Sequence, residues 1–113
     1  MKSQRTKALE IPIKVKRAVA ERDSIDGHPC CIWCGKPAPL SDTLAFSNAH
    51  VLRRSLGGKG TETNIVTLCW NCHQRFDGGD KKMMIFICNQ MKRHYGGEWS
   101  IKQQMYKKEN NND

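Results

Sequence analysis

The amino-acid sequence predicts a small α+β domain that is held together by cysteine ligands and has flanking helices at both ends. The chain has 113 residues, of which 38% are hydrophobic, so burial of apolar surface alone gives a marginal core and a staple is expected. Two C-x-x-C pairs, which begin at Cys31 and Cys69, supply candidate ligands for that staple. Short strand patterns lie between the pairs, and helical patterns lie before and after them.

The flanking helices are expected to begin and end at local signals. Residues 1–11 are expected to be a flexible basic arm, and Pro12 suits the first turn of a helix that continues through IKVKRAVAERD. Asp80 is expected to cap a helix over KKMMIFICNQMKRHY, and Gly96 is expected to end it. Ser100 is expected to cap a last helical segment.

The centre of the chain has the pattern of two short strands and a helix. Residues 44–52 carry enough apolar side chains for a strand, with His50 near its end, and residues 64–68 form the return strand. Residues 70–76 are expected to be helical. The expected organisation is therefore a single domain over 12–108, with a motif core over 31–77, C-terminal helices over 80–108 and a disordered tail over 109–113.

Charge and targeting signals narrow the class of partner. The formal net charge is +8 and the pI is about 9.4, which favours a polyanion. Without a long apolar run or a basic amphipathic stripe, nucleic acid is favoured over membrane, while a basic pI kept for solubility stays open. The N-terminus has no secretory signal, so the expected location is cytoplasmic and the thiols are expected to stay reduced.

The cysteines are best interpreted as a structural zinc site. Two residues between the members of each pair let both sulfurs of Cys31 and Cys34, and of Cys69 and Cys72, converge on one tetrahedral ion. A redox function would need only one pair. Cys30 could replace Cys31 only through a longer loop and is treated as spare. Cys88 lies in an apolar helical stretch and is expected to be a small buried residue.

The segment between the pairs resembles the HNH endonuclease superfamily, which has the ββα-metal fold, and specifically its four-cysteine branch in phages and bacteria. The resemblance runs from about Cys31 to Asp77. It rests on the order and spacing of short motifs: the two C-x-x-C pairs, Ala49-His50-Val51, Arg53-Arg54-Ser55-Leu56-Gly57-Gly58, Asn64-Ile65-Val66-Thr67-Leu68-Cys69, and Cys72-His73 with Asp77 four residues further on.

The resemblance implies a role for each motif residue. His50 matches the histidine that takes a proton from the attacking water, which suits an imidazole because its pKa lies near neutral pH. Asn64 matches the residue whose amide ties the loop between the strands and supports the base. His73 matches a ligand of the catalytic divalent ion, and Asp77 falls on the same helical face. That second ion would be Mg²⁺, Mn²⁺ or Ni²⁺.

The sequence departs from the family pattern just before His50. Many members have a further metal ligand there, whereas this chain has Asn48 and Ala49. Alanine cannot coordinate a metal, and an amide oxygen of Asn48 could, but strand alternation points the two residues to opposite faces. Simpler interpretations also exist for the other residues: His73 could hydrogen-bond to the zinc cluster, and Asp77 could be a turn residue.

Basic residues flank the motif in the glycine-rich stretch. Arg53, Arg54 and Lys59 are expected to contact DNA phosphates, with a solvated basic loop as the alternative for any one of them. The predicted function is an HNH-type endonuclease, a hydrolase that cleaves phosphodiester bonds in DNA. The alternatives are a zinc-dependent nucleic-acid-binding module of the same fold with weak or no cleavage, and a zinc ribbon for protein contacts. The resemblance also makes phage DNA-packaging or other DNA-processing proteins candidate partners, in a bacterial or phage-infected cell.

Overall fold

A short antiparallel hairpin followed by a helix forms the centre of the molecule. The computed structural model describes residues 1–39, 41, 44 and 46–108. Strands β3 (Ser47–His50) and β4 (Ile65–Leu68) pair with Ser47 opposite Leu68 and His50 opposite Ile65. Helix α3 (Trp70–Asp77) follows directly. The predicted α+β class with a ββα core is confirmed, and β3 begins three residues later than the strand expected over 44–52. The expected tail over 109–113 lies outside the described residues.

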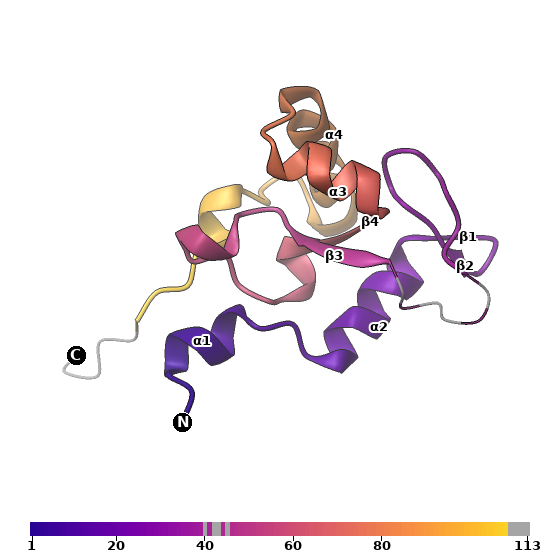
Figure 1. Ribbon diagram of the computed structural model, residues 1–113. Coiled ribbons are helices and arrows are strands. Elements are labelled where there is room, and N and C mark those ends of the chain that lie inside the picture. Colours follow the sequence, from indigo (N-terminus) through magenta and orange to yellow (C-terminus); the bar gives the residue numbers. More distant parts are fainter. Residues whose placement is uncertain (40, 42–43, 45, 109–113) are drawn as a thin grey trace.

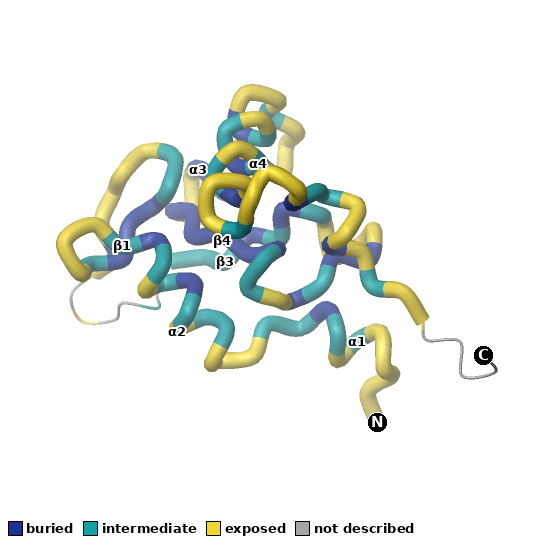
Figure 2. The backbone as a smooth tube through the Cα atoms, turned by 180° about the vertical axis from the view of Figure 1, so that it is seen from behind, coloured by how far each residue is buried: buried dark blue, intermediate teal, exposed yellow. Residues whose placement is uncertain are grey.

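Helices cover the hairpin from both sides. Figure 1 shows α1 (Gln4–Leu9) and α2 (Ile13–Arg22) on one side, and α3 and α4 (Lys81–Tyr95) on the other. All four residues of β4 are therefore buried, which explains why this strand is apolar without strict alternation. Figure 2 shows the difference between the two strands, since β4 is buried whereas β3 is mainly of intermediate burial.

Helix α4 supplies much of the core. Its N-terminus is capped as predicted, because the Asp80 side chain accepts a hydrogen bond from the Met83 N–H at 3.0 Å. Met83, Ile87 and Met91 recur at helical spacing and are fully buried, whereas Ile85 is 64% exposed. None of the helices in the described ranges combines the length and apolarity needed to cross a membrane.

The remaining elements are short. Strands β1 (Ser24–Ile25) and β2 (His28–Pro29) form a second, two-stranded sheet. Three 3-10 turns, η1 (Arg54–Leu56), η2 (Glu62–Asn64) and η3 (Ile101–Gln104), shape the loops around the hairpin. Ser100 caps η3 in a capping box, so the predicted cap is correct, but the helical segment ends after one turn as Met105 becomes extended and bridges to Gly58.

The N-terminal segment differs from the flexible arm expected over 1–11. Ser3 caps α1 by accepting a hydrogen bond from the Thr6 N–H at 3.1 Å. Leu9 is only 1% exposed. The few apolar residues of this segment show no clear periodicity, so its packing against the body of the protein was not predicted from the sequence.

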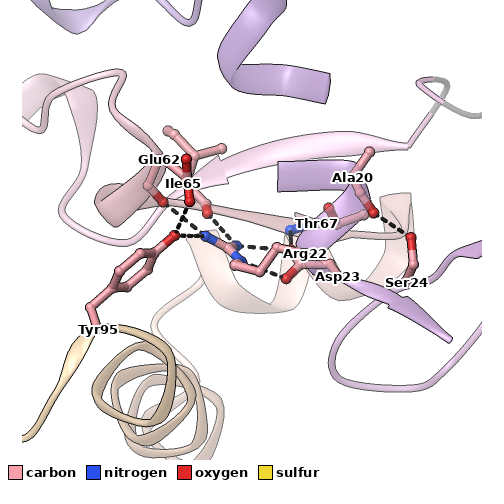
Figure 3. Close-up of polar contacts among 8 residues, drawn as sticks. All are labelled: Ala20, Arg22, Asp23, Ser24, Glu62, Ile65, Thr67 and Tyr95. Carbon is pink, nitrogen blue, oxygen red and sulfur yellow. Dashed lines mark hydrogen bonds and ion pairs between the residues drawn. The ribbon is translucent and has the colours of Figure 1, made fainter. Parts of the chain in front are cut away.

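A buried polar cluster joins α2 to the hairpin and to α4 (Figure 3). Arg22 Nε and Nη2 donate to the two carboxylate oxygens of Asp23 at 2.8 and 2.9 Å. The other guanidinium hydrogens are directed to the carbonyls of Glu62 at 2.9 Å and Ile65 at 2.7 Å, and to the Tyr95 hydroxyl at 3.0 Å. All five donors of the guanidinium group are thus matched with acceptors, which fixes α2 beside the hairpin.

Candidate functional site

Four cysteine side chains meet in one cluster, two from the loop that follows β2 and two from the start of α3. The sulfur atoms of Cys31, Cys34, Cys69 and Cys72 all lie within 4.8 Å of one another. The Sγ atoms of Cys34 and Cys69 are 3.7 Å apart. Bonds of about 2.3 Å to a central zinc ion put the sulfurs of a tetrahedral site about 3.8 Å apart, so the cluster has the dimensions of a zinc site.

The two remaining cysteines lie outside this cluster. The Cys30 thiol donates to the His28 carbonyl at 3.2 Å, which supports the choice of Cys31 over Cys30 as ligand. The Cys88 thiol lies 3.7 Å from the sulfur of Met84, and burial raises its pKa. Both therefore have local structural contacts away from the four-cysteine cluster.

The thiols of the cluster depend on one another for ionisation. Burial disfavours the Cys69 thiolate, but hydrogen bonds from the Cys72 N–H and from neighbouring thiols outweigh it, and the pKa of Cys69 falls to about 7. Burial and the adjacent sulfurs raise the pKa of Cys72. Four thiolates at this spacing repel one another, so the chemistry of the donor set calls for a cation.

Backbone hydrogen bonds hold the two cysteine pairs in place. The Gly35 N–H donates to the Cys31 carbonyl at 2.9 Å, and the Ile32 N–H donates to the Thr67 carbonyl of β4 at 3.1 Å. The ring of Trp33 packs edge-on against Phe86, with centroids 5.3 Å apart. The first pair is therefore fastened both to the hairpin and to α4.

A second group of side chains lines a polar pocket of about 310 Å³. The strand β3, the loop after it and the helix α3 contribute to its wall. The lining residues are Asn48, His50, Arg53, Arg54, Ser55, His73 and Asp77. Five residues singled out from the sequence thus lie at one pocket, together with Asn48.

His50 occupies the end of β3 and is oriented by the backbone. Its Nε2 lies 2.9 Å from the carbonyl oxygen of Leu9. Because a carbonyl only accepts, Nε2 carries the hydrogen and Nδ1 of the neutral ring has the free lone pair. Burial lowers the pKa of His50, the Leu9 hydrogen bond opposes this, and the charges of Arg54 and His73 lower it further. The ring is therefore held ready to accept a proton.

His73 and Asp77 face each other across one turn of α3. His73 Nε2 lies 3.4 Å from Asp77 Oδ2, a separation suited to two ligands of one ion. The His73 side chain is 21% exposed and that of Asp77 is 66% exposed. Among the described residues, His73 Nδ1 is buried without a hydrogen-bond partner. The imidazole and carboxylate fit a divalent cation with further positions open.

The two residues before His50, which depart from the family pattern, lie on opposite faces of β3. Ala49 is 1% exposed and belongs to the core, whereas Asn48 lines the pocket. This is the alternation expected along a strand. The neutral amide of Asn48 is therefore the group from this part of β3 that can offer an oxygen to a cation.

Asn64 is fully buried and braces the loop that follows β3. Its Oδ1 accepts from the Leu52 N–H at 2.8 Å. Its Nδ2 donates to the carbonyls of Leu52 at 3.2 Å and Lys59 at 2.9 Å. These bonds hold the turn between the strands, which is the supporting position that the resemblance implied.

The basic residues of the glycine-rich loop separate into two groups. Arg53 and Arg54 line the pocket, and Arg53 Nη2 donates to the Asp77 carbonyl at 3.0 Å. Lys59 does not line it. Its N–H donates to the Gln104 carbonyl, and the residue lines a different hollow together with Trp99 and Gln104. The contact of these three residues with DNA phosphates stays a prediction, and Lys59 would make it from a different hollow than the two arginines.

The Leu9 carbonyl and Ser55 were not among the candidate site residues predicted from the sequence. A backbone acceptor has no residue-type signature, so no pattern could have identified Leu9. Ser55 directly follows Arg54 in the sequence, and this adjacency was the one signal that it could lie at the pocket.

Comparison with known proteins identifies the family of the central segment. Residues 31–84 match the family model described as HNH endonuclease. This segment is therefore similar to HNH endonucleases. It contains both cysteine pairs and every residue that lines the pocket, and the resemblance inferred from the sequence is confirmed. No curated protein and no solved structure matched the chain.

Proposed function

We propose that this protein is a metal-dependent endonuclease that hydrolyses phosphodiester bonds in DNA. The observation that carries the proposal is the convergence of His50, His73 and Asp77 on one pocket rimmed by arginines, within the segment that matches the HNH family. A base, a partial metal site and phosphate-binding groups are the components that phosphodiester hydrolysis requires.

In this mechanism His50 activates the attacking water. Its Nδ1 removes a proton as the water oxygen forms a bond to phosphorus. The bond from phosphorus to the 3′ oxygen breaks, and that oxygen leaves and takes a proton from solvent, giving 5′-phosphate and 3′-hydroxyl ends. Asn64 maintains the loop, while Arg53 and Arg54 bind the non-bridging phosphate oxygens.

Two metals have separate tasks in the proposal. The four cysteines would hold structural Zn²⁺, which fixes the start of α3 and hence His73. His73 and Asp77, with Asn48 beside them, would hold Mg²⁺, Mn²⁺ or Ni²⁺. That ion, when bound, supplies positive charge to the transition state and to the leaving oxygen.

The proposal also includes a cellular setting. DNA is the macromolecule that suits the positive charge and the pocket, and the cytoplasm of a bacterium or a phage-infected host is the compartment proposed for it. Phage DNA-packaging or other DNA-processing proteins are the proposed class of partner.

A second function is favoured by one observation. The neutral Asn48 and the buried Ala49 stand where a charged ligand would strengthen metal binding. A protein with this site could bind DNA through the same surface and cleave it weakly or not at all.

A plasmid-nicking assay with Mg²⁺, Mn²⁺ or Ni²⁺ separates these functions. We expect the wild type to nick in the presence of metal, and His50→Ala to lose roughly 10²- to 10⁴-fold in rate with its zinc retained. His28→Ala is the matched control, because His28 Nε2 also contacts a backbone carbonyl, that of Ala38 at 2.7 Å, but does not line the pocket. Equal rates in wild type and His50→Ala would refute the base assignment. DNA binding without nicking under any metal would establish the binding module.

A further inference from the structure

The N-terminal segment packs closely against the backbone of Gly60, in the loop near the candidate site. The Gly60 N–H donates to the Ala8 carbonyl at 2.9 Å. A Cβ built on Gly60 would lie 1.8 Å from the carbonyl oxygen of Glu10. Because that neighbour is backbone rather than a flexible side chain, any larger residue at position 60 must displace the segment. Glycine at this position therefore permits the close approach.

The same segment is anchored by its own side chain. Leu9 is 1% exposed, and it is the buried residue of α1. A helix of six residues gains too few internal hydrogen bonds to be stable alone. Its position therefore depends on the Leu9 anchor and on the contact at Gly60.

The third contact of the segment is with His50. The Leu9 carbonyl oxygen, which lies between the two contacts at Ala8 and Glu10, accepts the Nε2 hydrogen of His50 at 2.9 Å. Residues 8–11 precede the segment that matches the HNH family, which begins at residue 31. The base is thus held by a part of the chain outside that match.

We propose that residues 8–11 are a positioning element, which holds the His50 ring through the Leu9 carbonyl so that Nδ1 is the nitrogen presented to water. This inference rests on the proposed function. An imidazole without a fixed partner on Nε2 rotates and exchanges its hydrogen between the two nitrogens, and only one orientation and tautomer places a lone pair at the attacking water. Gly60 is required indirectly, since it lets the segment lie close enough for the Leu9 carbonyl to reach the ring.

The test compares two glycine variants of the full-length, zinc-loaded protein. Gly60→Ala places a methyl group against the Glu10 carbonyl, whereas Gly97→Ala is the matched control because Gly97 is exposed and a Cβ there meets no atom within 4 Å. The measurements are nicking kinetics, zinc content and the ¹⁵N chemical shifts of the His50 ring, which report which nitrogen carries the hydrogen. Leu9→Ala loosens the same segment by removing its anchor.

In the wild type and Gly97→Ala we expect the hydrogen on Nε2. In Gly60→Ala we expect a mixture of tautomers, with kcat lowered roughly 10- to 100-fold and KM within about twofold of the wild type, as expected for a mispositioned base. Zinc content should be unchanged. If Gly60→Ala loses zinc, the same changes in Leu9→Ala decide the question.

Three results would overturn the inference. The first is a hydrogen on Nδ1 in the wild type. The second is an unchanged kcat in a variant whose ring signals have changed, and the third is a raised kcat, which would make the segment an inhibitory cover. If the wild type does not cleave DNA, the proposed function fails, but the ring-nitrogen signals of wild type and variants still show whether the Leu9 carbonyl holds His50.

Discussion

Two polar clusters lie close to the hairpin, and they differ in how many of their polar groups have a hydrogen-bond partner. In the cluster of Figure 3, Arg22 has an acceptor for each donor, and Asp23 also accepts from the Thr67 N–H at 3.0 Å. In the pocket, His73 Nδ1 is buried without a partner among the described residues, and Asp77 is largely exposed. Buried polar groups in a purely structural cluster are normally matched. This difference is the one expected if the first cluster supports the fold and the second holds a metal ion, as we propose.

The largest loss of stability is expected from Cys69→Ser, which should unfold the protein and so disrupt both the Arg22 cluster and the pocket. Cys69 directly precedes α3 and belongs to the four-cysteine cluster. Structural zinc sites contribute on the order of 10 kcal/mol or more to folding, so the variant should lose zinc and unfold or aggregate. Zinc content and thermal unfolding measure this. Cys88→Ser, outside the cluster, should retain zinc, and a Cys69→Ser protein with wild-type stability and zinc would exclude a structural site.

The second-largest loss of stability is expected when the Arg22 cluster loses its guanidinium group. Arg22→Met leaves the Asp23 carboxylate, which is 3% exposed, buried without its ion-pair partner. Removing one partner of a buried ion pair costs about 3–5 kcal/mol. Denaturant unfolding should show that loss, whereas the exposed Arg17→Met on the same helix should change stability by about 0.5 kcal/mol or less. Equal stabilities of the two variants would mean that the Arg22 cluster does not support the fold.

A smaller effect is expected at the rim of the pocket. Arg54→Ala should weaken DNA binding by roughly tenfold and reduce the dependence of log Kd on log salt by about one phosphate contact. Binding titrations over a range of salt concentrations measure both quantities. Lys59→Ala is the control from the same loop, because Lys59 does not line the pocket. A larger loss in the Lys59 variant would place the DNA on the other side of the loop.

The elements that follow local rules could be predicted from the sequence. The spacing of the cysteines predicted which four side chains cluster, and Asp80 was recognised as the cap of α4. The i,i+4 spacing of His73 and Asp77 placed them on one face of α3, as the structure shows. Each of these features is signalled by a short motif whose residues are close in sequence, such as each C-x-x-C pair.

The features that depend on distant pairs could not be predicted. Arg22 meets the Ile65 carbonyl 43 residues away, and His50 meets the Leu9 carbonyl 41 residues away. Both acceptors are backbone atoms, which every residue has. The loop around Lys59 also turns toward a distant segment, since the Lys59 N–H donates to the Gln104 carbonyl, and a glycine-rich stretch does not reveal the direction of such a turn.

Metal binding to the zinc-loaded protein tests the central claim most directly. Titration with Mn²⁺, followed by electron paramagnetic resonance, should show that the wild type binds a single Mn²⁺ ion in addition to zinc. His73→Ala should lower that affinity by at least roughly tenfold while zinc content stays constant, since an imidazole ligand is lost. Equal Mn²⁺ affinity in wild type and His73→Ala, or no Mn²⁺ binding by the wild type, would contradict the assignment of the pocket as the catalytic metal site.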